Sequence, residues 1–341
     1  MSAIAAFRDG CRRVRRAPAL VLGLYGALVL VALPAAFALR GLLAAHLGDS
    51  LAADRAADGV NLDWWNEFAA QAVGVGATFS PAIIGFGGTL KNLSDIVDGV
   101  KPAPIVAMLA VVYLGVLTFL SGGVIDRLAR ERAVLDYGFF AACGGHALRL
   151  LRLNAMVLSV FWWVVVPWHG LLFDTMLPMV TRDLTQERVA FAWRLLAYAA
   201  VGVPAVAVGL VADYARIRLV VEDRLSAVGA LLAGGRFVRR RIGRALSIYL
   251  VNALAFVVLL AIWAMVAPGA GRSGLSLWTG FGVAQAYVVS RLVLRLVCIA
   301  SQLSFFQHEL AGPSHVAGPA TKWPESPAVE MLVNRPDGAS K

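Results

Sequence analysis

The stretch RFVRRRIGRALSIYLVNALAFVVLLAIWAMVA, Arg236–Ala267, combines the two features that decide the fold. Five of its first nine residues are arginine, and the following segment, Ala245–Ala267, carries no charge. A helix of that length rises ~35 Å, which is enough to cross the ~30 Å hydrocarbon core of a bilayer. The segment therefore predicts a membrane-spanning helix. The arginines place its first end in the cytoplasm, because loops rich in positive charge stay on that side during insertion.

The composition of the whole chain agrees with this interpretation. Of the 341 residues, 59% are hydrophobic and only 15% are charged, and the mean hydropathy is +0.73. An ordinary soluble domain carries about 25% charged residues. A soluble globule of this composition would expose too much apolar surface to water, so lipid must surround much of the chain. We expect one membrane domain rather than two soluble domains.

The apolar runs predict an all-α, polytopic membrane bundle of about six transmembrane helices. The expected spans are residues 17–39, 103–125, 153–173, 189–212, 245–267 and 274–300, within a membrane domain over residues 17–310. Residues 1–16 form a basic cytoplasmic N-terminus, and residues 40–102 form an extracytoplasmic loop. Residues 311–341 are polar and proline-rich, which is typical of a disordered tail, and we expect this tail in the cytoplasm.

The uncharged segment Phe68–Leu90 is long enough to cross but contains Pro81 and several glycines. If it does not cross, eighteen arginines fall on the cytoplasmic side and seven basic residues fall outside. If it does cross, the two later basic loops face outward, against the positive-inside rule. We therefore expect a re-entrant hairpin or an external helix there. Both termini then lie in the cytoplasm, and a bacterial cytoplasmic membrane is the expected location.

Two expected cytoplasmic stretches, Arg132–Arg152 and Asp213–Leu232, mix charge with apolar residues at helical spacing. Such helices lie along the membrane surface with one face in the headgroup region. We expect Gly234 and Gly235 to end the second helix before the arginine cluster. Each basic residue near an anionic surface gains about 1 kcal/mol. The candidate lipid contacts in the cluster are Arg236, Arg239, Arg240 and Arg241.

Arg291 and Arg295 form a further candidate site, because residues four apart share one face of a helix. In one interpretation the last span runs to about Ala300, and the pair faces a polar cavity that accepts an anionic group. In the other, the span is Gly274–Ser290 and Leu292–Leu310 continues as an amphipathic helix at the surface. We favour the second interpretation on sequence grounds, because it buries no charge.

Several function classes find no support in the sequence. The predicted spans contain no acidic residue, which argues against a proton-coupled transporter. No nucleotide-binding, metalloprotease or serine-hydrolase motif occurs, so we expect no cofactor and favour a protein that is not an enzyme. The three cysteines lie far apart and predict no metal site. The arginines flank apolar runs rather than base-stacking aromatics, so nucleic acid is not an expected partner.

Three stretches carry a resemblance to known proteins: Gly85–Ser94, Gly138–Cys143 and Asp213–Arg241. Together they resemble uncharacterised multi-pass bacterial membrane proteins. They are also loosely similar to the membrane domain attached to some glycerophosphodiester phosphodiesterases. The resemblance implies a helical bundle with in-plane cytoplasmic helices and transfers no catalytic residue. The soluble catalytic domain of those enzymes is absent, so their activity is not expected.

Three hypotheses for the function follow. The first is a non-enzymatic membrane protein that engages anionic lipid or a protein partner through its basic cytoplasmic helices. The second is the permease subunit of a transporter, with Asp213–Arg244 docking on a soluble ATPase. The third is an enzyme that modifies lipid within the membrane. The third requires a polar cavity that gathers Arg291 and Arg295 with Asn252 or Asp213.

Overall fold

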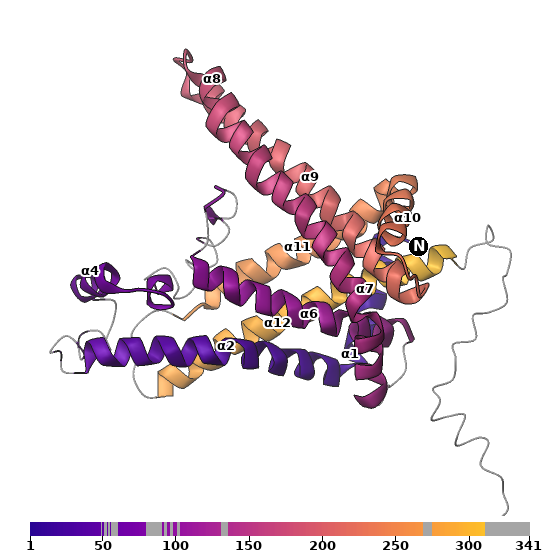
Figure 1. Ribbon diagram of the computed structural model, residues 1–341, viewed down its shortest axis with the longest axis horizontal. Coiled ribbons are helices and arrows are strands. Elements are labelled where there is room, and N and C mark those ends of the chain that lie inside the picture. Colours follow the sequence, from indigo (N-terminus) through magenta and orange to yellow (C-terminus); the bar gives the residue numbers. More distant parts are fainter. Residues whose placement is uncertain are drawn as a thin grey trace, which may run out of the picture.

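The computed structural model describes residues 1–48, 61–79, 103–130, 136–268 and 275–310, together with isolated positions between residues 49 and 100 (Figure 1). Within these ranges every regular element is helical, and six helices are long and apolar enough to cross a membrane. The predicted class, an all-α polytopic membrane bundle, is confirmed.

The six long helices differ in length and in how they are interrupted. They are α2 (Pro18–Leu47), α6 (Pro104–Arg130), the continuous helix Asp136–Thr181, α9 (Glu187–Val221), α11 (Ile242–Val266) and α12 (Leu275–Leu310). The continuous helix contains α7 (Asp136–Trp163), two π-helical turns (Val164–Trp168 and Leu171–Met176) and α8 (Leu177–Thr181). Shorter helices are α1 (Ala3–Arg15), α4 (Leu62–Gln71), a 3-10 turn η1 (Gly76–Thr78) and α10 (Ala227–Arg240).

The long helices form two groups that diverge from a common end (Figure 1). Helices α2, α6, α11 and α12 pack together and are called here the four-helix bundle. The continuous α7–α8 helix and α9 form a hairpin that leans away from the bundle, and this pair is called the α7–α9 hairpin. At the common end α6 packs on the start of α7, α10 packs on α9, and α1 packs on α12 and α11.

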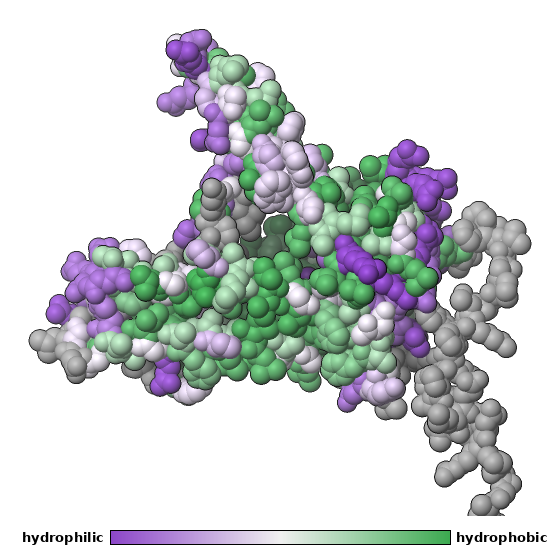
Figure 2. Space-filling model, in the orientation of Figure 1, coloured by the Kyte–Doolittle hydropathy of each residue, from purple (hydrophilic) through white to green (hydrophobic). Residues whose placement is uncertain are grey.

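The protein core lies at this common end. Its largest fully buried side chains include Tyr214, Phe305 and Phe306, with the ring of Phe237 packed against all three. Along the spans, by contrast, only 6–22% of the most apolar windows is buried by protein. Figure 2 shows the resulting hydrophobic surface along the four-helix bundle, with hydrophilic surface at its ends. Lipid therefore supplies the solvent for most of the apolar side chains.

Glycines permit three close helix crossings near the common end. A Cβ on Gly10 of α1 would lie 2.5 Å from Ser301 Oγ of α12. One on Gly123 of α6 would lie 2.6 Å from Cys143 Sγ of α7, and one on Gly234 of α10 would lie 2.9 Å from the backbone nitrogen of Ala215 in α9. Small residues let helix backbones approach in this way, which gives van der Waals contact where lipid offers no hydrophobic driving force.

Helix α1 is held on α12 by polar contacts as well. The Asp9 carboxylate accepts a hydrogen bond from Arg13 Nε (2.8 Å), and Arg13 Nη1 donates to Gln307 Oε1 of α12 (2.8 Å) and to the Leu128 carbonyl of α6 (3.0 Å). Burial works against ionisation of Asp9, but hydrogen bonds from Ser304 and Arg13 outweigh it and lower the pKa of this carboxyl group. The carboxylate is therefore charged at neutral pH.

After Ala212 the helices begin and end at other residues than the sequence predicted. Helix α9 continues to Val221, and a turn then separates it from α10. Asp223 takes a left-handed φ of 46° in this turn, and Ser226 caps α10 by accepting a hydrogen bond from Gly229 N. The expected break at Gly234-Gly235 does not occur, because α10 runs through both glycines. Close packing on α9 stabilises the helix there and offsets the low helix propensity of glycine.

Two further expectations concern the start of α7 and the second half of α12. Helix α7 begins at Asp136 and passes residue 153 without a break, so the described part of Arg132–Arg152 is an extension of a span rather than a separate helix. Helix α12 passes Arg291 unbroken, which both interpretations of the last span allow. Its second half is buried against α1 and other helices, as the exposures of Leu303 and Phe305 (both 0%) show. An amphipathic helix at Leu292–Leu310 with one face in lipid does not describe this packing.

Some expectations fall on residues that the structure does not describe. Of the segment Phe68–Leu90, the described part contains the end of α4 and the 3-10 turn, and residues 80–90 lie outside. The tail 311–341 also lies outside the described residues.

The crossing of α10 on α9 gives a direct test of the packing. We expect Gly234→Ala to lower the free energy of unfolding by about 1–3 kcal/mol, because the new methyl group meets backbone of α9. The control is Gly235→Ala, whose Cβ would meet only Val211 Cγ1 at 3.8 Å and which gains helix propensity. Thermal unfolding in detergent measures both. Equal melting temperatures for the two variants would contradict the assigned packing.

Candidate functional site

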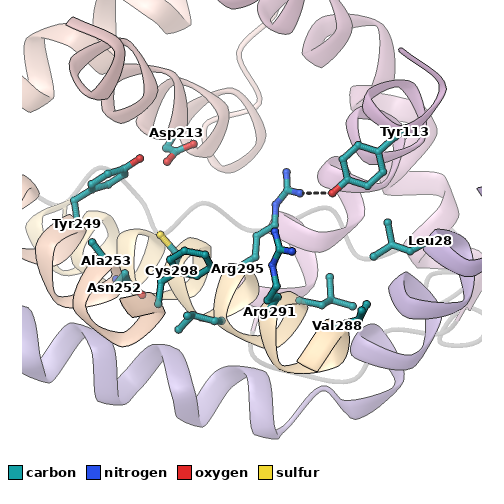
Figure 3. A pocket seen from close by; sticks show the side chains of 13 residues that line it. Leu28, Tyr113, Asp213, Tyr249, Asn252, Ala253, Val288, Arg291, Arg295 and Cys298 are labelled. Carbon is teal, nitrogen blue, oxygen red and sulfur yellow. Dashed lines mark hydrogen bonds between the residues drawn. The ribbon is translucent and has the colours of Figure 1, made fainter. Parts of the chain in front are cut away.

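A cavity of about 550 Å³ lies where the four-helix bundle meets the α7–α9 hairpin (Figure 3). Its walls come from α2, α6, α9, α11 and α12. The polar lining residues are Tyr113, Asp213, Tyr249, Asn252, Arg291, Arg295 and Cys298. A second cavity of about 260 Å³, lined by Asn154, Arg216 and Gln302 among others, shares Asp213, Arg295 and Cys298 with the first.

The residues that line this cavity lie part-way along helices that are long and apolar enough to cross a membrane. Asn252 lies ten residues after the start of α11, and Leu28 lies ten residues after the start of α2. Leu28 is therefore ~15 Å beyond the start of α2, and Asn252 is ~12 Å beyond Arg244, the last arginine of α11. Arg291 lies near the middle of α12, ~24 Å from Leu275 and ~28 Å from Leu310. Two arginines are therefore present part-way along α12, away from both of its ends.

Arg291 and Arg295 lie on one face of α12 and extend toward the cavity (Figure 3). Arg295 Nη1 donates a hydrogen bond to Tyr113 Oη of α6 (2.9 Å). The Arg291 guanidinium carbon lies 5.6 Å from the ring centre of Tyr287, and that ring stacks on Trp263 at 4.3 Å. Neither arginine forms an ion pair with any residue that the structure describes, so their charge is not balanced by a carboxylate.

A chain of hydrogen bonds crosses the second cavity and joins four helices. Asp213 Oδ1 of α9 accepts from Arg216 Nη1 (2.8 Å), and Asp213 Oδ2 accepts from Gln302 Nε2 of α12 (3.1 Å). Arg216 Nε donates to Asn154 Oδ1 of α7 (2.9 Å), and Asn154 Nδ2 donates to Thr118 Oγ1 of α6 (2.9 Å). The charge of Asp213 is thus balanced by Arg216. Of the charged residues that line the two cavities, Arg291 and Arg295 are left without a partner of opposite charge in the described part of the protein.

Asn252 is a buried polar residue with incomplete hydrogen bonding. Its side chain is 6% exposed, and its Nδ2 donates to the Ile248 carbonyl (2.9 Å). Its Oδ1 is buried without a partner in the described part of the protein. A buried acceptor without a donor costs about 1–3 kcal/mol, so such groups call for an explanation.

The structure divides the predicted site residues into two places. Arg291 and Arg295 lie at the cavity together with Asn252 and Asp213, the set that the third sequence hypothesis required. The residues of the arginine cluster lie on α10 and at its end, as a separate surface. Of these, Arg236, Arg239 and Arg240 are exposed, and Arg241 pairs with Glu309 Oε2 of α12 (2.5 Å).

Sequence reasoning missed several polar residues of the site. Tyr113, Tyr249, Asn154, Arg216 and Gln302 were not proposed, although each is a polar side chain on a long helix. The spacing of Asp213 and Arg216 by three residues was one available signal, because it places both on one face of α9. The other residues come from different helices, so no local pattern connects them.

No protein family, no curated protein and no solved structure was found to match this chain. The resemblance to the membrane domain of glycerophosphodiester phosphodiesterases therefore stays a sequence-based prediction, and the function is argued from the site alone.

The hydrogen-bond chain predicts an energetic coupling between Asp213 and Arg216. We expect Asp213→Asn to lower the free energy of unfolding by about 1.5–3 kcal/mol, because Arg216 loses its charged partner. In an Arg216→Met background the same change should cost less. Denaturant unfolding in micelles measures the four members of this cycle. Asp183→Asn, in the exposed turn before α9, is the control and should change stability by less than about 0.5 kcal/mol. An equal cost in both backgrounds would contradict the coupling.

Proposed function

We propose that this chain is a multi-pass protein of a bacterial cytoplasmic membrane that binds an anionic lipid headgroup in the cavity between the four-helix bundle and the α7–α9 hairpin. The observation that carries the proposal is the pair Arg291 and Arg295, which line the cavity within the length of α12 and have no carboxylate partner among the described residues. An arginine in the hydrocarbon region is costly, by as much as about 2.5–3.5 kcal/mol at the midplane on insertion scales, and a bound anion offsets that cost.

The apolar part of the lining favours a lipid as the source of the anion. Leu28, Phe256, Val288 and Leu294 line the same cavity, next to the arginines. Beside the cavity, α9 leaves the bundle, and both groups of helices expose apolar side chains. An acyl chain can therefore follow apolar surface while its headgroup reaches the guanidinium groups. A lipid phosphate is well suited to arginine, whose planar guanidinium donates two parallel hydrogen bonds.

The distribution of charge supports a cytoplasmic location for the common end of the helices. Helix α1, the end of α6, α10 and the start of α11 all lie at this end and together carry ten arginines. By the positive-inside rule this end faces the cytoplasm. The cavity then lies in the cytoplasmic half of the bilayer, within reach of inner-leaflet headgroups.

Substitution of the two cavity arginines tests this function. We expect Arg291→Gln/Arg295→Gln to weaken binding of phosphatidylglycerol at least about tenfold, because charge-assisted hydrogen bonds to phosphate are lost. Native mass spectrometry of the purified protein titrated with the lipid measures the affinity. The control is Arg182→Gln/Arg188→Gln, which removes the same charge near the opposite end of the hairpin.

Two results would reject the proposed function. One is an unchanged affinity in the Arg291→Gln/Arg295→Gln protein, with melting behaviour like that of the wild type. The other is an equal loss in the Arg182→Gln/Arg188→Gln control, which would indicate a response to net charge rather than to the cavity.

A second candidate function, contact between α10 and the anionic surface of the inner leaflet, is favoured by one further observation. The outward face of α10 carries exposed Val228 (53%) and Leu232 (61%), followed at helical spacing by Arg236 and Arg239. The opposite face packs on α9. An apolar stripe that continues into basic residues is typical of a helix at the headgroup boundary.

Hydrogen–deuterium exchange in nanodiscs tests this contact. We expect residues 225–240 to exchange more slowly when the nanodisc contains phosphatidylglycerol than when it contains only phosphatidylcholine, because anionic lipid holds α10 at the surface. Arg236→Gln/Arg239→Gln/Arg240→Gln should remove this difference. A matched triple change on the exposed face of α1, Arg8→Gln/Arg12→Gln/Arg15→Gln, should leave it in place. A difference that persists in the α10 variant would refute the contact.

A further inference from the structure

The cavity has two chemically different ends, and this difference constrains its ligand beyond a negative charge. Figure 3 shows Arg291, Arg295 and Tyr113 toward one end and Asp213 with Tyr249 toward the other. The inference drawn from this arrangement rests on the proposed function, because it concerns the headgroup that the same cavity binds.

The first end offers hydrogen-bond donors. Both guanidinium groups are donor-only, and Arg295 uses one of its N–H groups on Tyr113 Oη. Because Tyr113 Oη accepts from Arg295, its own O–H is free to donate in another direction. Three donors of α6 and α12 thus line one end of the cavity. This end matches the non-bridging oxygens of a phosphate.

The second end offers acceptors. Asp213 is an acceptor-only carboxylate, and each of its oxygens accepts a single hydrogen bond from protein, although a carboxylate oxygen has room for two. Asn252 also lines this cavity, with 6% of the residue exposed, and its buried Oδ1 has no partner among the described residues. Tyr249 adds a hydroxyl that can accept as well as donate. These groups need donors, and a phosphate diester has none to give.

We propose that the lipid bound in this cavity has a headgroup with both a phosphate and hydrogen-bond donors, either hydroxyl or ammonium. The phosphate lies at Arg291 and Arg295, and the donor-bearing part of the headgroup extends toward Asp213, Tyr249 and Asn252. A cavity of about 550 Å³ leaves room for both parts. A site built to accept hydrogen bonds discriminates against a ligand that lacks the donors, because its own polar groups are then left buried and unpaired.

A comparison of lipids with equal charge tests this inference. Phosphatidylglycerol and phosphatidylmethanol both carry one negative charge, but only the glycerol headgroup has hydroxyl donors. We expect the full-length protein to bind phosphatidylglycerol at least about tenfold more tightly than phosphatidylmethanol. Phosphatidylethanolamine and phosphatidylcholine form a second pair, in which only the first has N–H donors. The pair with the larger ratio identifies the donor as hydroxyl or ammonium.

Two single substitutions assign the preference to the acceptor end. Tyr249→Phe and Asn252→Leu should each reduce the ratio between the donor-bearing lipid and its donor-free partner. Tyr25→Phe is the matched control for the first. The Tyr25 hydroxyl donates to Gln285 and lies outside the cavity lining, so its removal should leave the ratio as in the wild type. Melting temperatures of all variants establish that each is folded.

The outcomes separate this inference from the proposed function. Equal affinities within both lipid pairs would overturn the inference, while the proposed function would stand if Arg291→Gln/Arg295→Gln still weakened binding of both members. A preference that Tyr249→Phe and Asn252→Leu leave unchanged would also overturn it, because the donors would then be recognised elsewhere. Failure of the arginine variant to alter any affinity would reject the proposed function itself.

Discussion

Close packing of helix backbones at one end of the molecule is the interaction on which the rest of the structure depends. Gly10, Gly123 and Gly234 bring α1 onto α12, α6 onto α7 and α10 onto α9 at distances that a side chain would prevent. Lipid is as apolar as leucine, so the hydrophobic effect adds little to helix association in a bilayer. Van der Waals contact between closely spaced backbones, with buried aromatic side chains around it, joins the two groups of helices.

Packing at one end leaves the helices free to diverge beyond it. The α7–α9 hairpin departs from the four-helix bundle, and the cavity lies where they separate. Polar side chains are concentrated at this point because neighbouring helices can supply their hydrogen-bond partners there. The chain from Thr118 to Gln302 satisfies its members by hydrogen bonds between four helices. Arg291 and Arg295 have no carboxylate partner among the described residues, and their unbalanced charge in this cavity is the basis of the proposed lipid site.

The local sequence predicted the fold class, but it placed a helix break at Gly234-Gly235 and a separate helix at Arg132–Arg152 that the structure does not have. Long uncharged runs are sufficient to indicate six helices that cross a membrane, because a bilayer requires each segment to satisfy its own backbone. The break expected at Gly234-Gly235 was wrong, because the contact with Ala215 that stabilises the helix belongs to a segment about twenty residues earlier. The amphipathic character expected for Leu292–Leu310 does not match the packing for a similar reason: α1 and neighbouring helices cover the second half of α12.

By itself, the sequence determined that this chain is a helical membrane protein and that Arg291 and Arg295 share one helical face. Hydropathy and helical spacing are local properties, and residues close in the chain carry them. Only the tertiary structure decided that these arginines line a cavity opposite Asp213 and Tyr249, with Asn252 in its wall. Asp213 lies on α9, Tyr249 and Asn252 lie on α11, and the arginines lie on α12. The packing of glycines and aromatic rings at the common end sets their relative positions. No local sequence pattern specifies how close these side chains from different helices lie to one another.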